Sequence, residues 1–519
     1  MIKISQEMGD FAQVKTYQQQ QAAIATQLPP ATSTTDPTMQ ALKEGQVLLS
    51  QGSKTSVQQA IAKFEQARAS AKKNGERQQE NIALLALGAA YDSLGQKQSA
   101  LDAYKQALPI AEQLGDRYSQ ATILVGIGQV HNSTGQLQPA LAAFKQALPI
   151  LRSLKNRSGE STVLNNMGNV YSKLGDYAQA LNYHRQSLAI AEATGDHTRQ
   201  NRTLNNMGLV YSDLGQYQSA FDAFNQALAS LQADSDRFDR ALTLSNLGTV
   251  YSYVGQLDQA LASFQQALEV LKEADDPGRE AYALANIGSV YYDRHDYKAS
   301  LDYYQRSLKL LRQVQDTEGE STVLNNIGLI YDDLQQTEPA LTHYNQALAI
   351  AQTTQDLAGE ATTLVNLGRT YYTRRDYAKA ASYQTKAATL AQKLGNLRIA
   401  GYAFTNLGRT QLAAKQLVAA ETSLRSGTQA WESLRAGLGN DDRNKISIFE
   451  DQSSTYRLLQ KTLVAQNQPD AALEVAERGR ARAFAELLAE RLPTQAATVA
   501  PKLQPPRLAQ IRAIAKQHN

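Results

Sequence analysis

The chain has 519 residues, and its 52 lysines and arginines nearly balance its 49 aspartates and glutamates. This balance argues against a nucleic-acid or anionic-membrane surface as the main role, and the absence of cysteine excludes disulfides, thiolate metal sites and a cysteine nucleophile. No apolar run has the length of a membrane span, and the first residues lack the apolar core of a signal peptide. We therefore expect a cytoplasmic protein.

The N-terminal part, residues 1–37, is polar and rich in glutamine. It predicts one helix that ends at Pro29 and Pro30, followed by a Ser/Thr/Pro linker. A first helical hairpin is expected next, built on Gly45, Phe64 and Ala67, with three inserted residues near 53–55.

Residues 81–440 form nine consecutive blocks of forty residues that align without a gap. Apolar residues at places four, seven, eight and eleven make one helical stripe, and those at places twenty, twenty-four, twenty-seven and twenty-eight make a second. Each block is therefore expected to be a helical hairpin. Because copied units grow by stacking on their neighbours, the blocks predict one array over residues 38–440.

Small residues predict how the two helices of a block meet. Place eight is glycine in all nine blocks, and place twenty is alanine or serine. A glycine inside a helix costs roughly 1 kcal/mol relative to alanine, so we infer a close crossing as its reason. In the third block this crossing would join Gly168 and Ala180, with the aromatic residues usual at places eleven and twenty-four beside it.

Recurring residues also predict the helix ends. Asp or Asn at place thirty-six is expected to cap the first helix of the next block, as at Asp276 before Pro277. Glycine at place fifteen would end the first helix, but four later blocks have other residues there, which predicts different turns or mild strain. These residues are His295, Gln335, Arg375 and Lys415. Pro109 and Pro149 are expected to kink the second helix or to end it early.

The order Leu, Gly, Tyr, Ala, Phe, Ala at these offsets resembles the tetratricopeptide repeat. In the fifth block the matching residues are Gly248, Tyr251, Ala260, Phe264 and Ala267. The resemblance covers about four fifths of the chain and implies an all-α, right-handed superhelical α-solenoid of about eleven repeats, whose first helices line the concave face. The long unit is similar to the repeats of kinesin light chain and of the spindle-orientation adaptors.

One polar place recurs on the face of the first helix opposite the core. Place six is asparagine in seven successive blocks: Asn166, Asn206, Asn246, Asn286, Asn326, Asn366 and Asn406. An amide has two donors and an acceptor, so a regular row of amides predicts a ladder that pairs with the backbone of an extended peptide, as the resemblance to the long-repeat proteins implies. The alternative is inheritance by duplication, although each asparagine costs roughly 0.5 kcal/mol more than alanine in a helix.

Charged and aromatic residues beside the asparagines complete the candidate peptide-binding site. The middle of the array contributes Asp293, Asp333, Tyr253 and Tyr292, with Asp213, Asp332, Tyr282 and Tyr372, and the last two blocks contribute Arg369 and Arg409. If a ligand recognises this charge distribution, its acidic groups would lie near the arginines and its basic groups near the aspartates. The alternative is a solvated charge run.

Catalytic patterns are missing from the sequence. The six histidines lie without the i, i+4 spacing of a helical metal site, and His131 and His184 occupy places that are aromatic elsewhere. There is no P-loop, Rossmann glycine pattern or G-x-S-x-G motif. We expect no enzymatic activity, no metal and no cofactor.

The C-terminal part is predicted as a degenerate hairpin over residues 441–492 and a Pro/Ala linker and tail over residues 493–519. Residues 477–483, 486–488 and 508–515 look like the segment that joins tetratricopeptide arrays to the caspase-like CHAT domain of bacterial, especially cyanobacterial, proteins. This resemblance implies a longer protein, because the His/Cys pair of such a domain is absent here. The alternative for Arg478, Arg480 and Arg482 is a basic helix face.

These patterns together predict a protein-interaction scaffold that binds a peptide segment of a partner protein in a concave groove. One alternative is the regulatory arm of a CHAT protease, which would contact its own effector domain in cis. Another is an assembly module that self-associates into a homo-oligomer. Neither nucleic acid nor a membrane is expected as a partner.

Overall fold

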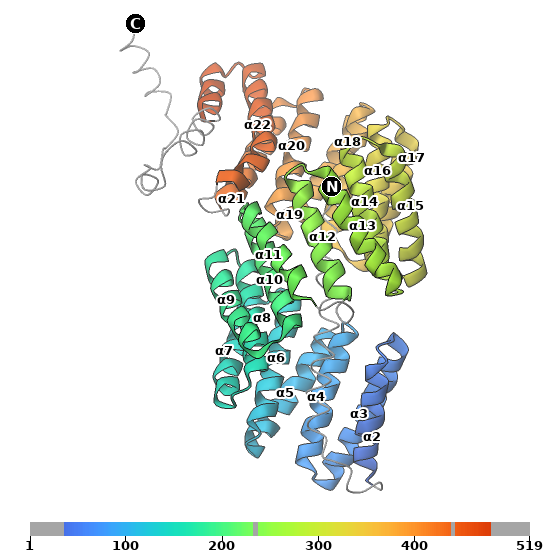
Figure 1. The fold of residues 1–519 in the computed structure, drawn as a ribbon. Coiled ribbons are helices and arrows are strands. Elements are labelled where there is room, and N and C mark those ends of the chain that lie inside the picture. Colours follow the sequence, from blue (N-terminus) through green and yellow to red (C-terminus); the bar gives the residue numbers. More distant parts are fainter. Residues whose placement is uncertain (1–35, 232–236, 437–441, 479–519) are drawn as a thin grey trace, which may run out of the picture. The chain divides into compact units, whose positions relative to one another are not determined.

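The computed structural model describes residues 36–231, 237–436 and 442–478, and within these ranges all regular structure is helical (Figure 1). The expected all-α solenoid of helical hairpins is therefore confirmed. The helices are α2 (Pro37–Ser50), α3 (Lys54–Asn74), α4 (Arg77–Ser93), α5 (Lys97–Leu114), α6 (Arg117–Ser133), α7 (Leu137–Ser153), α8 (Arg157–Lys173), α9 (Tyr177–Thr194), α10 (His197–Asp213), α11 (Tyr217–Ser230), α12 (Arg237–Tyr253), α13 (Leu257–Glu273), α14 (Pro277–Asp293), α15 (Tyr297–Val314), α16 (Thr317–Asp333), α17 (Thr337–Thr354), α18 (Leu357–Thr373), α19 (Tyr377–Lys393), α20 (Leu397–Ala413), α21 (Leu417–Ala436) and α22 (Asp442–Ala465). Residues 469–478 are helical as well.

The described helices belong to two compact units. The first contains residues 36–212 and 217–250, and the second contains residues 213–216 and 251–478. Within each unit a first helix packs against the second helix of its own block and against the second helix of the block before, as α4 does with α5 and α3, and α14 with α15 and α13. This stacking of neighbours is how a repeat array buries its apolar faces.

Side-chain caps fix the start of the first helices. The Asp276 side chain accepts a hydrogen bond from the backbone N–H of Arg279 at 2.9 Å, and Pro277 occupies the first turn. Asn156 accepts from Gly159 in the same way, also at 2.9 Å. These bonds satisfy backbone donors that have no partner within the helix. The predicted caps are confirmed at these positions.

The turn between the two helices of a block keeps one form throughout the described blocks. Place fifteen is left-handed both where it is glycine, as at Gly95 with φ 74°, and where it is not, as at His295 with φ 59° and Arg375 with φ 62°. The N–H of place sixteen then bonds to the carbonyl of place eleven, as Asp296 does with Tyr291 at 2.9 Å. The expectation of different turns is therefore wrong: packing imposes the same turn, and a side chain at this φ carries the mild strain.

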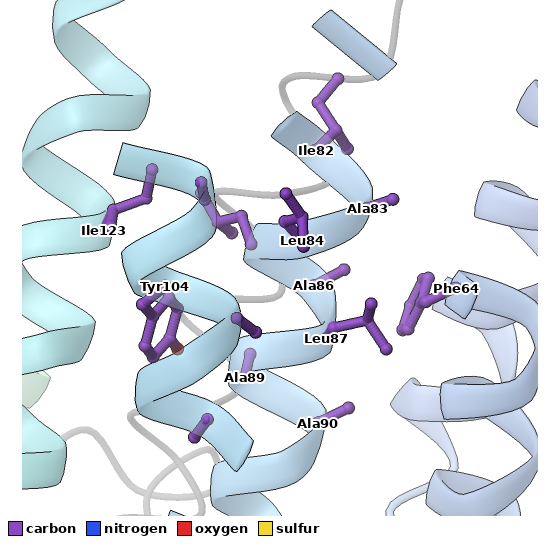
Figure 2. Close-up of a cluster of buried hydrophobic side chains, with 14 of the residues drawn as sticks. Phe64, Ile82, Ala83, Leu84, Ala86, Leu87, Ala89, Ala90, Tyr104 and Ile123 are labelled. Atoms are coloured by element: carbon purple, nitrogen blue, oxygen red, sulfur yellow. The ribbon is translucent and has the colours of Figure 1, made fainter. Parts of the chain in front are cut away.

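Glycine at place eight admits a ring against the helix backbone. A Cβ on Gly88 would lie 2.4 Å from the Tyr104 ring, and one on Gly168 would lie 2.6 Å from the His184 ring. Place twenty touches the same crossing, since the Ser300 hydroxyl donates to the carbonyl oxygen of Gly288 at 2.7 Å. The predicted close crossing of places eight and twenty is confirmed in the sixth block by this bond, and in the third block Gly168 lies against the His184 ring of the second helix. Figure 2 shows the core that results in the first blocks.

The two internal prolines do not end their helices early. Helices α5 and α7 run through Pro109 and Pro149 to Leu114 and Ser153. Both prolines are exposed, and so is Lys105, whose carbonyl loses the N–H of residue 109. Water can donate a hydrogen bond to that carbonyl, because the missing backbone bond lies on the solvent side of the helix. The prediction that the prolines end their helices early is therefore wrong.

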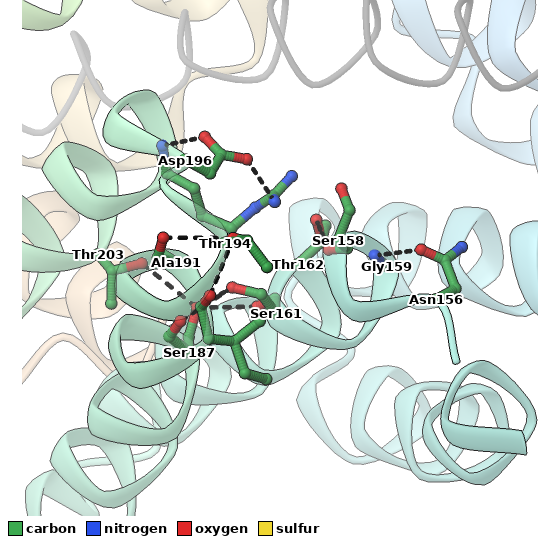
Figure 3. A network of polar contacts seen from close by, with 12 residues as sticks. Asn156, Ser158, Gly159, Ser161, Thr162, Ser187, Ala191, Thr194, Asp196 and Thr203 are labelled. Atoms are coloured by element: carbon green, nitrogen blue, oxygen red, sulfur yellow. Dashed lines mark hydrogen bonds and ion pairs between the residues drawn. The ribbon is translucent and has the colours of Figure 1, made fainter. Parts of the chain in front are cut away.

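Polar groups inside the array are mostly paired. In the third and fourth blocks the Ser161 hydroxyl donates to the carbonyl of Ser187 at 3.0 Å, and the Ser187 hydroxyl lies 3.3 Å from the hydroxyl of Thr203 (Figure 3). These bonds tie the second helix of one block to the first helices of its own block and the next. Pairing of this kind is the rule for buried polar groups, which makes an unpaired one informative.

Candidate functional site

The seven asparagines occupy the same position on successive first helices. In each unit, we call the surface formed by places six, nine and thirteen of its first helices the ladder face of that unit. Asn166, Asn206 and Asn246 lie in the first unit, on α8, α10 and α12, and Asn286, Asn326, Asn366 and Asn406 lie in the second, on α14, α16, α18 and α20.

The asparagines are less open to solvent than the sequence suggests. Asn246, Asn286 and Asn326 are only 2%, 7% and 2% exposed, so the expectation of solvent-facing side chains is wrong for these three. Asn166, Asn206, Asn366 and Asn406 are half-buried. The reason is that place six faces the neighbouring first helix as well as the ladder face, as the hydrogen bonds between blocks show.

Three of the asparagines bond to a side chain of the preceding block. The amide nitrogen of Asn206 donates to the Asn165 oxygen at 3.2 Å. The same bond joins Asn246 to Asn205 at 3.1 Å, and Asn366 to Asn325 at 3.0 Å. Each acceptor stands at place five, which the sequence analysis did not single out. We call these three bonds the rungs, and they give Asn206, Asn246 and Asn366 a structural role.

The other four asparagines follow a block that has no amide at place five. The residues there are Val125, Ser245, Ala285 and Val365. The Ser245 hydroxyl is itself used, since it donates to the Ala241 carbonyl at 2.8 Å. Within the described part of the chain, the amide nitrogens of Asn166 and Asn286 are buried without a hydrogen-bond partner. The buried amide of Asn326 lies beside the Tyr304 hydroxyl of the preceding block. The residue at place five thus decides which amides form rungs.

Two of the predicted charged residues are paired within the chain. The guanidinium of Arg369 bonds to the Asp332 carboxylate of the preceding block, with Nη2 at 3.1 Å and Nε at 3.2 Å. The Tyr292 hydroxyl donates to the Asp333 carboxylate, and burial together with this bond raises the pKa of Tyr292. These pairs join α18 to α16 and α16 to α14, so they hold first helices together whether or not a ligand is bound.

The remaining predicted residues are not drawn into these pairs. Asp293 is exposed at the end of α14, where partial desolvation raises the pKa of its carboxyl. Tyr253 is 39% exposed at the end of α12. Arg409 is half-buried on α20. The ladder face of the second unit therefore has an internally paired centre and an arginine at its C-terminal side.

Other features considered from the sequence concern metal binding, membrane spans, the buried His184 and the two terminal segments. In the described part of the chain, no cluster of three or more His, Asp or Glu side chains could hold a metal ion. Among the described residues, no helix combines the length and the apolar character that crossing a membrane requires. His184, which occupies a place that is aromatic in most other blocks, packs in the core. The N-terminal helix before residue 30 and nearly all of the segment resembling the CHAT linker lie outside the described residues.

A family model described as tetratricopeptide repeat matches residues 159–233, 239–313 and 279–353. Two further models with this description match residues 361–394 and 83–118, and together the matches cover about half of the chain. Tetratricopeptide repeat protein 28 of Mus musculus and that of Homo sapiens are each 42% identical to the chain over 79 residues. The match covers 15% of this chain, which spans only 3% of the length of these relatives.

Solved structures with similar folds include the apo form of the quorum sensor NprR from B. thuringiensis. That similarity has a TM-score of 0.49 and 14% identity, and it covers 67% of this chain and 97% of the other. A signal transduction ATPase with a tetratricopeptide repeat sensor, from Pyrococcus horikoshii, has a TM-score of 0.48 and 17% identity, with 79% of this chain and 62% of that one covered.

Proposed function

The chain belongs to the tetratricopeptide repeat family, whose repeats support a role as a protein-interaction scaffold, and we propose that it binds an extended peptide segment of a partner protein along the ladder face of one unit. The peptide would place backbone carbonyl groups on the amide nitrogens that the chain does not use itself. No residue of the chain is assigned a catalytic role.

The unpaired amides carry this proposal. A buried N–H group without an acceptor costs about 1 to 3 kcal/mol, and native structures rarely keep one without a reason. Asn166 and Asn286 keep such a group at the same place of their blocks. A peptide carbonyl is a fitting acceptor because extended backbone offers one at regular intervals.

Access separates the four asparagines without a rung into two pairs. Asn166 and Asn406 have half-buried side chains, so they are the first contacts that we expect. The amide nitrogen of Asn166 is itself buried, so a ligand reaches it only when this side chain turns outward. Asn286 and Asn326 are almost fully buried, so a ligand reaches them only if the side chains that cover them move. Asn206 and Asn366 are also half-buried, but their amide nitrogens are used in rungs.

A matched pair of variants tests the proposal. The immobilised chain is exposed to a degenerate library of dodecapeptides with amidated C-termini, and captured peptide is quantified for the wild type, for Asn166→Ala/Asn406→Ala and for Asn206→Ala/Asn366→Ala. Each lost hydrogen bond to a ligand should cost about 0.5 to 1.5 kcal/mol. The first variant should therefore lose capture at an unchanged melting temperature.

The second variant is the control, with the same residue change at positions that are also half-buried. It should keep capture and melt at a lower temperature, because it breaks two rungs. If the wild type captures no peptide, or if the two variants lose capture equally, peptide binding by unpaired amides is wrong. A self-associating module would instead give a mass that rises with concentration and is the same in both variants.

A further inference from the structure

The two arginines of the ladder face stand at the same place of consecutive blocks but have different surroundings. Arg369 on α18 pairs with Asp332, which is place twelve of the block before. For Arg409 on α20 the corresponding residue is Tyr372, and place thirteen beside it is Thr373. No carboxylate from these two places of α18 reaches Arg409, and within the described part of the chain it has no ion pair or hydrogen bond.

Asn406 lies on the same helix, three residues before Arg409, so the two side chains are neighbours on one helix face. It follows a block with Val365 at place five, and no rung forms. Both side chains are half-buried. The last block of the array therefore presents an amide and a guanidinium together, neither of them used by the described residues.

These groups favour one kind of ligand group. A guanidinium has five N–H donors and no acceptor, and its planar fork matches a carboxylate. The amide nitrogen of Asn406 adds donors one helical turn away. At Arg369 the chain supplies the carboxylate itself, through Asp332. At Arg409 the place that corresponds to Asp332 is Tyr372, so the chain supplies no carboxylate from that place.

We propose that Asn406 and Arg409 anchor one acidic side chain of the bound peptide, with the Arg409 guanidinium on the aspartate or glutamate carboxylate and the Asn406 amide on the adjoining backbone carbonyl. This anchor rests on the peptide-binding function proposed above. The sequence led us to expect acidic ligand groups near both arginines. The anchor involves Arg409 alone, because the guanidinium of Arg369 already pairs with the carboxylate of Asp332. The ligand is a segment of a partner protein with an internal acidic residue.

Oriented peptide libraries test the anchor. Three dodecapeptide libraries, each amidated at the C-terminus, fix glutamate, glutamine or lysine at the central position and randomise the others. The wild type should retain the glutamate library about fivefold to tenfold more than the glutamine library, the range of a charge-assisted pair that is partly exposed. Raising the salt from about 0.05 M to about 0.5 M should reduce this preference.

Arg409→Gln should abolish the preference for glutamate while the glutamine library is retained as before. The matched control, Arg369→Gln, should keep the preference and lower the melting temperature, because it removes an ion pair within the chain. The anchor is wrong if Arg409→Gln keeps the preference or if Arg369→Gln removes it to the same extent.

Two further results have distinct meanings. If peptides with a free C-terminal carboxylate are captured and the amidated libraries are not, the acid at Arg409 is a chain terminus and the side-chain anchor is wrong. If the wild type retains none of the libraries and no peptide with a free C-terminus, the peptide-binding function itself fails and the anchor fails with it. Equal retention of all three libraries leaves peptide binding in place and overturns the anchor alone.

Discussion

His184 is a buried titratable group whose replacement can be predicted in detail. It occupies place twenty-four of the third block, where most blocks have an aromatic ring, and it is fully buried against Gly168. Its Nδ1 lies 2.9 Å from the Asn165 oxygen. A carboxamide oxygen only accepts, so Nδ1 carries the proton, and Nε2 is left without a partner among the described residues.

Burial lowers the pKa of His184 from 6.5 to about 3. The folded protein therefore binds fewer protons at this site than the unfolded chain does below pH 6.5. Its contribution to the free energy of unfolding is fully present above pH 6.5 and is lost as the pH falls towards 3. At pH 5 the loss from this one group is about 2 kcal/mol, since each pH unit between the two pKa values is worth about 1.4 kcal/mol.

The substitution His184→Phe should remove this dependence without disturbing the fold. The fourth block already has Phe224 at this place, and its Asn205 accepts a hydrogen bond from Asn246. At pH 8 the variant should be close to wild type in stability, and at pH 5 it should be more stable by about 2 kcal/mol, as the linkage requires.

Native-state hydrogen exchange of peptides from α8, α9 and α10 is the assay, because repeat arrays need not unfold in two states. Opening free energies are measured for both proteins at pH 8, 6.5 and 5. All other titrating groups are common to the two proteins and cancel in the difference. Parallel pH curves for wild type and variant would refute the reasoning.

Other predictions concern packing, the rungs and the turns. Gly208→Ala should lower the free energy of unfolding by about 1 to 3 kcal/mol, because its Cβ would lie 2.6 Å from the Phe224 ring. Gly278→Ala should be neutral or stabilising, since its Cβ would meet no atom nearer than 3.5 Å. Chemical denaturation of both variants checks this difference. Ala285→Asn should add a rung to Asn326, raise the melting temperature and reduce any contribution of Asn326 to peptide affinity; a lower melting temperature would contradict the pairing rule. Lys415→Gly should raise the melting temperature, because φ at this residue is 59°, a backbone that costs a side chain about 1 kcal/mol.

Most of the fold could be predicted because it follows from repetition. Most blocks repeat glycine at place eight, a ring at place twenty-four and Asp or Asn at place thirty-six. The structure has the crossings and caps that these residues predict. The turn at His295 could not be predicted from its own residue, because packing of the two flanking helices determines it. Pro109 was misjudged since its exposure depends on which side of the helix faces water.

The candidate site could be predicted only in part, because the pattern within one block does not indicate hydrogen bonds between neighbouring blocks. Place six is conspicuous as a column of asparagines, but its role depends on place five of the preceding block, where Asn165, Asn205 and Asn325 alternate with apolar or small residues. A comparison of each place with its neighbours forty residues away would have found this pairing.

A crystal structure of the chain with a peptide recovered from the libraries would test the central claim most directly, because it shows which amides the ligand uses. The account predicts peptide carbonyl oxygens about 3 Å from the amide nitrogens of Asn166 or Asn406, with the rungs from Asn206, Asn246 and Asn366 unbroken. A peptide bound to the second helices, or one whose carbonyls replace the rungs, would contradict it.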